Sequence, residues 1–224
     1  MNEMEDTMNH ASKRTVLLVL VVATALTAAP KAPDPQRVFA EDFSRAEALP
    51  DTLLILNGEF ALRSEGGNRF LELPGTPLDQ YGIMFGPTRQ AGDRVSARFW
   101  GTRAGRQQPA FGVGLNGVGG YRLMISAAKR RLELLKGDVV VAGADWIWTT
   151  GRWAHLSLQV RAMAADKWRV EGKAWMEGER EPEGWNVVWN EDAMPAPGRA
   201  SVWAHPYSGT PIRLDDLRVV PAAP

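Results

Sequence analysis

The sequence has no cysteine among its 224 residues. Disulfide bonds and thiol catalysis are therefore excluded, and so is lipid attachment by the bacterial lipoprotein route. Only three histidines are present, so the side chains that most often bind zinc or haem are scarce. Lysine and arginine number 26 together, as do aspartate and glutamate. Because this balance leaves no net positive field, we do not expect nucleic acid as a partner.

Motifs of several enzyme classes are also missing. No Gly-x-Ser-x-Gly nucleophile elbow is present, and the glycine-rich segment 112–120 lacks the Lys-Ser/Thr pair that ends a phosphate-binding loop. We therefore interpret 112–120 as a hairpin. Ser157 and His155 share one face of a predicted strand, but this proximity alone does not make a Ser-His-acid triad. The sequence assigns no catalytic residue.

One long hydrophobic run is present, and it lies near the N-terminus. A basic pair precedes residues 15–29, which are apolar, too short to span a bilayer comfortably, and end in small residues. We predict that residues 1–32 are a signal peptide or N-terminal anchor with a short spacer. The protein would then be exported to the periplasm or exterior of a bacterial cell. Pro30 makes cleavage after Ala29 awkward, and a membrane is a partner only if the segment is not cleaved.

From Val38 onward, short segments of alternating polarity follow one another, separated by glycine, proline and asparagine. This spacing of strands and turns predicts an all-β protein, a two-sheet antiparallel β-sandwich, as one domain over residues 38–221. No repeat of fixed length indicates a propeller or a solenoid. The segments with the clearest period of two are 94–100, 110–116, 121–126, 131–137, 153–160, 167–175 and 212–220.

The alternation also predicts which way side chains point. In residues 153–160 the apolar series from Ala154 to Val160 must face the core, which leaves Trp153 and His155 on the opposite face. A tryptophan and a histidine on an otherwise polar face indicate a partly covered surface. Loops that cover such residues for structural reasons are the alternative.

Tryptophan is unusually frequent, with nine in the chain. Trp175 and Trp185 bracket the polar segment 176–184, so they either clamp a structural corner or wall a site that stacks a flat ligand. Gly178 allows a turn that other residues resist, which favours the structural interpretation. Further tryptophans in residues 145–153 either overhang a binding face or fill a satellite core, and the sequence leaves both open.

Four segments together resemble the concanavalin A-like lectin/glucanase jelly roll, in the laminin-G-like form common in exported bacterial proteins. They are FAEDFS at 39–44, the hairpin at 119–137, the strand and loop over 151–185, and IRLDDLRV at 212–219. The resemblance covers nearly the whole predicted domain. It implies the fold but says little about activity, because this fold hosts lectins, hydrolases and interaction modules.

The resemblance also implies a possible calcium site and a catalytic motif, and the sequence can be searched for the residues of each. Jelly rolls of this kind often hold Ca2+ between the first and last strands, and the carboxylates available there are Asp42, Asp215 and Asp216. Related glucanases carry a Glu-x-Asp-x-x-Glu strand, which this sequence lacks. A non-catalytic function is therefore favoured, although catalysis stays open.

These observations predict an exported module that binds carbohydrate or another cell-envelope polymer. The alternatives are a glycoside-processing hydrolase or lyase on the same fold, and a structural or sensory ectodomain with no small ligand. Aromatic rings stack on sugar rings, while polar side chains bond their hydroxyls, and residues 203–207 are the densest such cluster. The outward-pointing side chains predicted to bind the ligand are Arg98, Trp100, Arg122, His155, Trp203 and His205.

Overall fold

The computed structural model describes residues 38–75, 80–164 and 166–222. Within these ranges the chain forms fifteen strands and one turn of 3-10 helix, η1 (Ala127–Lys129). No helix in the described ranges is long and apolar enough to cross a bilayer. The predicted signal segment, residues 1–32, lies outside the described residues.

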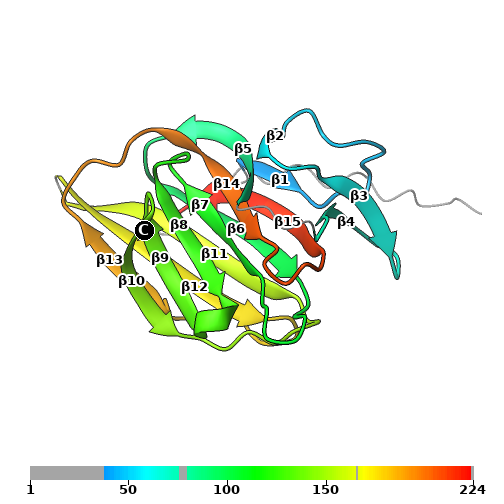
Figure 1. The fold of residues 1–224 in the computed structure, drawn as a ribbon. Helices are drawn as coiled ribbons and strands as arrows, with labels where there is room; N and C mark the ends of the chain where they lie inside the picture. Colours follow the sequence, from blue (N-terminus) through cyan, green and yellow to red (C-terminus); the bar gives the residue numbers. More distant parts are fainter. Residues whose placement is uncertain (1–37, 76–79, 165, 223–224) are drawn as a thin grey trace, which may run out of the picture. The chain divides into compact units, whose positions relative to one another are not determined.

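Sheet A has eight strands and contains both ends of the described chain. Its order is β13-β12-β11-β6-β15-β4-β3, and β1 also pairs with β15. Figure 1 shows the blue strand β1 alongside the red strand β15. The strands of sheet A are β1 (Phe39–Glu41), β3 (Ala61–Glu65), β4 (Asn68–Leu73), β6 (Asp93–Trp100), β11 (Ala154–Ala164), β12 (Lys167–Met176), β13 (Val187–Glu191) and β15 (Ile212–Pro221).

Sheet B has seven strands in the order β10-β9-β8-β7-β14-β5-β2. They are β2 (Leu54–Asn57), β5 (Tyr81–Arg89), β7 (Ala110–Leu115), β8 (Tyr121–Ser126), β9 (Arg131–Lys136), β10 (Val139–Asp145) and β14 (Gly198–His205). All pairings in both sheets are antiparallel. The predicted two-sheet antiparallel β-sandwich is confirmed.

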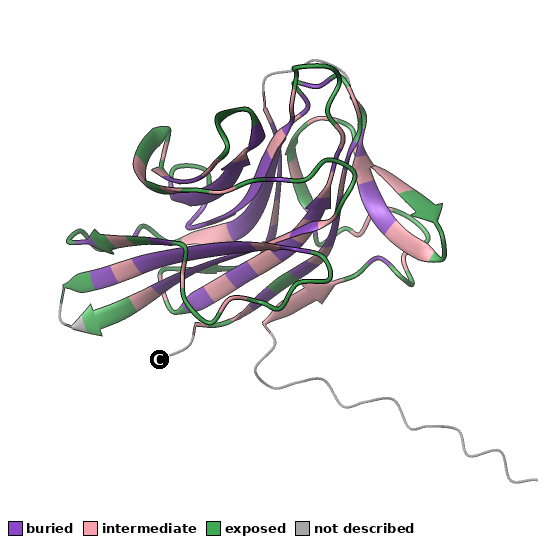
Figure 2. Ribbon diagram, turned by 90° about the horizontal axis from the view of Figure 1, so that it is seen from below, coloured by how far each residue is buried: buried purple, intermediate pink, exposed green. Residues whose placement is uncertain are grey.

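The core lies between the inner faces of the two sheets, as the period of two requires. On β11, Ala154, Leu156 and Leu158 are fully buried. His155, which lies between Ala154 and Leu156, points to the opposite face of the sheet and is partly exposed. Phe99 of sheet A stacks on Phe111 of sheet B with ring centroids 5.1 Å apart. Figure 2 shows buried positions alternating along the strands and exposed ones at the hairpin ends. Along β11, side chains therefore alternate between the core and the outer face as the sequence predicts.

The connections between strands use residues that tolerate a left-handed backbone. The predicted hairpin at 112–120 is formed, and Asn116 and Gly117 have φ of 65° and 76° at its turn. Gly178, two residues after the end of β12, has φ of 83°, as its predicted turn requires. Such angles are strained for residues with a bulky side chain, so these turns depend on asparagine and glycine.

A polar contact also joins the two sheets. The Tyr121 hydroxyl of β8 donates to Glu191 Oε2 of β13 at 2.9 Å, and Lys136 Nζ reaches the same oxygen at 2.6 Å. Burial raises the pKa of Tyr121, and its bond to Glu191 adds to the rise. Burial also acts to raise the pKa of Glu191, but Lys136 and its other donors outweigh it and lower that pKa. The carboxylate therefore stays charged and bonded at neutral pH.

Close approach of the sheets at Gly172 gives a test of the fold. A Cβ at this position would lie 2.5 Å from Leu123 Cδ1, and Leu123 is fully buried with little room to shift. Gly172→Ala should therefore lower the free energy of unfolding by about 1–3 kcal/mol, measured by chemical denaturation. Gly119→Ala is the control, because a Cβ there meets nothing within 4 Å. Equal stability of the two variants would contradict this packing.

Candidate functional site

The six predicted ligand-binding residues lie on two opposite surfaces. Each sheet has an outer face, the one turned away from the other sheet. Arg98, Trp100 and His155 point from the outer face of sheet A. The other three, Arg122, Trp203 and His205, point from the outer face of sheet B. The set therefore cannot contact one ligand, and each group has to be considered separately.

Trp203 is not placed to stack on a sugar. Only 5 % of the residue is exposed. A Cβ on neighbouring Gly82 would lie 2.8 Å from the ring, so the ring rests against the bare backbone of β5. The Arg122 guanidinium lies over the ring, 5.1 Å from its centroid, and the indole Nε1 donates to Ser201 Oγ at 2.8 Å. The predicted stacking role of Trp203 is corrected: the ring is outward but already covered by protein.

Arg98 and Trp100 are also engaged by protein groups. The Arg98 guanidinium donates to Asp215 at 2.6 Å and pairs with Asp216 at 3.0 Å. The Arg213 guanidinium lies 4.3 Å from the centroid of a Trp100 ring. These contacts stabilise the outer face of sheet A and leave His155 as the member of the group beside open space.

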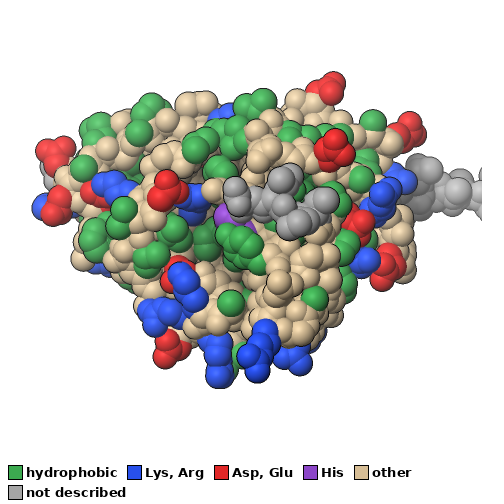
Figure 3. Space-filling model, viewed as in Figure 1, with side chains coloured by type: hydrophobic (Ala, Val, Ile, Leu, Met, Phe, Trp, Pro, Cys, Tyr) green, Lys and Arg blue, Asp and Glu red, His purple; other side chains and the backbone are tan. Residues whose placement is uncertain are grey.

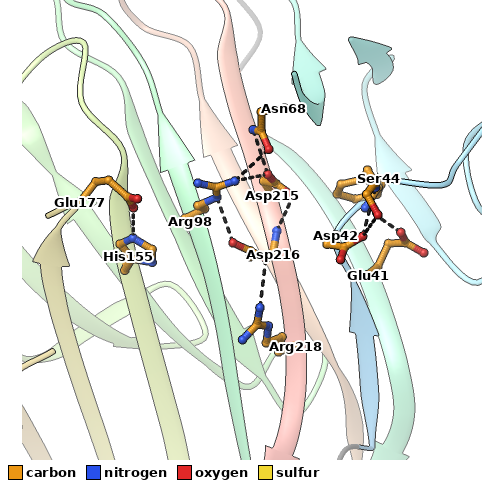
Figure 4. A network of polar contacts seen from close by, with 11 residues as sticks. Glu41, Asp42, Ser44, Asn68, Arg98, His155, Glu177, Asp215, Asp216 and Arg218 are labelled. Carbon is orange, nitrogen blue, oxygen red and sulfur yellow. Dashed lines mark hydrogen bonds and ion pairs between the residues drawn. The ribbon is translucent and has the colours of Figure 1, made fainter. Parts of the chain in front are cut away.

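The predicted calcium ligands do not gather around one point. Figure 4 shows Asp215 directed at Arg98, while Asp42 accepts hydrogen bonds from Ser44 in the loop that follows β1. Burial raises the pKa of Asp215, and the hydrogen bond from Arg98 opposes that rise. The pKa of Asp42 is lowered, chiefly by its hydrogen bonds from Ser44. In the described part of the chain, no group of three or more His, Asp or Glu side chains could hold a metal ion.

A pocket of about 300 Å³ opens on the outer face of sheet B, beside the turn between β8 and β9. We call it the Tyr207 pocket. Its floor is apolar, and one carboxylate and one ammonium stand at its side. The side chains that matter here are Met124, Leu135, Glu133, Lys129, His205 and Tyr207.

Tyr207 is held at the mouth of this pocket by a tight turn. The amide of Gly209, with φ of 68°, donates to Pro206 at 2.9 Å and closes the turn. The Thr210 hydroxyl fixes the turn by donating to the carbonyl of Thr102 at 2.8 Å. Tyr207 is 55 % exposed, and it is the only exposed aromatic side chain among the residues described.

The Tyr207 ring lies against that of His205. The two ring centroids are 5.3 Å apart and the planes differ by 18°. The Tyr207 hydroxyl lies 3.2 Å from His205 Nδ1. This stacking orients one aromatic face and leaves the other available, so the pair forms a platform.

Glu133 supplies the carboxylate of the Tyr207 pocket. It is 7 % exposed and accepts hydrogen bonds from Ser126 Oγ and, at 3.1 and 3.2 Å, from Lys129 Nζ. Arg130, with φ of 57°, ends η1 and reverses the chain, so that β9 returns with Glu133 beside Lys129. The pocket thus offers a fixed acceptor and a charged donor beside an apolar floor.

The outer face of sheet A has a separate hollow of about 370 Å³. Trp175 lines it and stacks on His155, with centroids 5.1 Å apart and planes within 7°. Trp185 lies under the ammonium of Lys173, 4.7 Å away. The two tryptophans that bracket 176–184 are therefore on the outer face of the sheet, and Trp175 borders open space instead of clamping a corner.

The tryptophans of residues 145–153 are divided between the two interpretations. Trp148 is 8 % exposed and packs edge-on against Phe111 in the core. Trp153 packs against Phe70 on the outer face of sheet A, with the Arg98 guanidinium 4.6 Å from its ring centroid. Neither ring borders the Tyr207 pocket.

Sequence reasoning missed Tyr207, Glu133 and Lys129. Tyr207 belongs to the cluster at 203–207 that the sequence singled out, but it lies in a turn, where the period of two gives no direction. Glu133 and Lys129 come together only through the turn at 127–130. The aromatic cluster at 203–207 therefore contains one ring that protein atoms cover, Trp203, and one that is exposed, Tyr207.

Comparison with known proteins shows which solved structures have a similar fold. No protein-family model matches the chain, and no curated protein matches it in sequence. Among solved structures, carbohydrate binding module CBM66 from Bacillus subtilis matches with a TM-score of 0.53 and 12 % identity, over 75 % of this chain and 95 % of that one. The PL-14 alginate lyase from Aplysia kurodai matches with 0.53 and 11 %, over 83 % and 99 %. A xylan β-1,4-xylosidase from Bacillus halodurans C-125 matches with 0.56 and 14 %, over 87 % and 41 %.

The domain has a concanavalin A-like jelly-roll fold. The resemblance predicted from the four sequence segments is confirmed at the level of fold. The three similar structures include a binding module and two enzymes, so the fold does not by itself decide between binding and catalysis.

The environment of Trp203 predicts how its removal acts. Trp203→Ala should lower the free energy of unfolding by about 3–5 kcal/mol, because it removes a buried ring together with the contact of that ring with the Arg122 guanidinium. Chemical denaturation measures the change. Unaltered stability, combined with lost binding of a glycan, would restore the stacking role that the sequence predicted.

Proposed function

We propose that this protein is an exported, non-catalytic module that binds carbohydrate in the Tyr207 pocket. The observation that carries the proposal is the exposed Tyr207 ring, stacked on His205 at the mouth of a pocket with an apolar floor. Leaving an aromatic ring in water is unfavourable, and a rigid turn holds this one there. A sugar ring, which has an apolar face, is a ligand that such a platform suits.

The polar groups of the pocket suit hydroxyl ligands. Glu133 is an acceptor and Lys129 a donor, and they stand together at one side. Sugar hydroxyls both donate and accept, so a pyranose lying on Tyr207 could bond both groups while its apolar face stays on the ring. At about 300 Å³ the pocket has room for a short part of a glycan, such as a chain end.

The lining argues against glycoside hydrolysis. Glycosidases need two carboxyl groups flanking the scissile bond. Glu133 is the one carboxylate among the residues that line the Tyr207 pocket, and Lys129 and Ser126 already bond it. The hydrogen-bonded pair of Tyr207 and His205 could still transfer a proton, so a lyase activity is the second candidate. Export rests on the apolar segment 15–29.

Removal of the platform is the direct test. Binding of the parent protein is first screened on a glycan array, and Tyr207→Ala is then compared with it by titration calorimetry on the best ligand. We expect affinity to fall by about 1–3 kcal/mol, with unfolding free energy unchanged within about 0.5 kcal/mol, because the ring contacts solvent and ligand instead of the core.

Ile147→Ala is the matched control, since Ile147 is 63 % exposed and does not line the pocket. It should bind like the parent. A parent that binds no glycan, or Tyr207→Ala that binds as well as the parent, would overturn the proposal. Release of unsaturated products from a bound polysaccharide would instead support the second candidate function, that of a lyase.

A further inference from the structure

The outer face of sheet A is hollow at its centre because two small residues lie side by side there. Ser96 of β6 pairs directly with Ser157 of β11. The next strands on either side place Arg218 of β15 beside Ser96 and Lys173 of β12 beside Ser157. This row across four strands therefore runs large, small, small, large. We call the space above the two serines the Ser157 hollow.

Larger residues surround the hollow in the neighbouring rows. Arg98 pairs with His155, which pairs with Trp175, to one side. Arg94 pairs with Gln159 to the other side. The hollow of about 370 Å³ is thus built by the register of the sheet, with side chains as its rim.

The polar segment 177–185 forms one wall of the hollow. The Lys173 ammonium donates to the carbonyl of Pro182 at 2.7 Å and pairs with Glu181 at 3.0 Å. His155 bonds Glu177 where the same segment leaves β12, as Figure 4 shows. These contacts hold Glu181 at the rim, so the wall is fixed by several polar contacts.

Two groups in the hollow have unused hydrogen-bonding capacity. Ser157 is 2 % exposed, and its buried hydroxyl has no hydrogen-bond partner among the described residues, so a molecule in the hollow reaches it only when a neighbouring side chain moves aside. A buried hydroxyl without a partner is unfavourable unless a bound molecule supplies one. Arg94 meets Glu181 only at 4.0 Å, beyond hydrogen-bond distance. Its donors are therefore available to a molecule in the hollow.

The rim balances donors against acceptors. Arg94 and Arg218 carry positive charge, while Glu181 and Asp216 carry negative charge. An anionic ligand would gain from the arginines but would be repelled by the two carboxylates. Hydroxyl groups both donate and accept, so a neutral sugar unit can satisfy both kinds of group, with the edge of Trp175 as an apolar wall.

We propose that the Ser157 hollow is a second carbohydrate site, which binds a neutral sugar unit. It lies on the sheet opposite the Tyr207 pocket and does not depend on it. A module with sites on opposite faces can hold two glycan chains at once, so it can cross-link a polymer. Binding to a dense polysaccharide then gains from multivalency, beyond the affinity of either site.

The test uses the Tyr207→Ala protein, so that the pocket of sheet B does not contribute. Neutral hexasaccharides of glucan, xylan and mannan, and a uronate hexasaccharide, are titrated at millimolar concentrations and followed by calorimetry. We expect Tyr207→Ala to keep saturable binding of a neutral hexasaccharide. Adding Arg94→Ala should weaken this binding about 10-fold or more. Melting temperature should not change, because Arg94 lies on the surface of the sheet.

Two further variants keep the outcome decisive. Arg63→Ala removes an arginine that is 59 % exposed and pairs with Glu72, away from the hollow, so it should bind like its parent. Ser96→Leu should fill the hollow and abolish binding; if it fails to fold, the Arg94→Ala result stands alone. No binding of any neutral hexasaccharide by Tyr207→Ala, equal binding after Arg94→Ala, or preference for the uronate would each overturn the proposal.

Failure of this site is distinguishable from failure of the Tyr207 pocket. The contribution of Tyr207 is read in the Arg94→Ala background, where the hollow is disabled. Loss of affinity there on adding Tyr207→Ala supports the pocket whatever the hollow does. If the full-length parent binds one ligand per chain and Tyr207→Ala binds none, the Tyr207 pocket is supported and the Ser157 hollow is refuted as a site.

Discussion

Close packing of two sheets without any disulfide is the constraint on which the structure depends. Stacking of Phe99 on Phe111, and the contact of Leu123 with the bare backbone of Gly172, leave no room for a strand to slip. A slip of one residue in the pairing of a strand would move all the core side chains of that strand to the solvent-facing side of the sheet. The register of both sheets is therefore fixed by the core, and the same register decides which side chains reach the outer faces.

The Ser157 hollow follows from that register, whereas the Tyr207 pocket also depends on the turns at 127–130 and 206–209. Small residues on an outer face leave space, which their larger neighbours border: Ser96 and Ser157 do this on sheet A. On sheet B, Gly82 lets Trp203 lie flat, where Arg122 covers it. The face is thus filled at Trp203 and open beside Tyr207, at the end of the same strand. Trp203 and Tyr207 therefore differ in what covers the ring, because the Arg122 guanidinium lies over the indole whereas more than half of Tyr207 is exposed.

The sequence predicts seven of the strands with their inward and outward faces, because alternation and turn residues are local properties, and four segments together predict the concanavalin A-like fold. It does not predict β2 to β5, whose residues do not show a clear period of two. It does not predict which sheet an outward side chain belongs to. Arg98 and Arg122 have the same pattern around them and end on opposite surfaces. Nor does it show that Arg213 covers Trp100, or that the segment around Glu181 lies over a row of serines. Those contacts join residues far apart in the chain, so only the folded structure reveals them.

We propose that a glycan binds on the outer face of sheet B at the exposed Tyr207 ring, not at the buried Trp203. Mapping of backbone amide shifts by nuclear magnetic resonance during titration with the best array ligand tests it most directly. We predict the largest shift changes at residues 205–210 and 126–135, which surround the Tyr207 pocket. Saturable binding that leaves both of these segments unchanged would contradict the account.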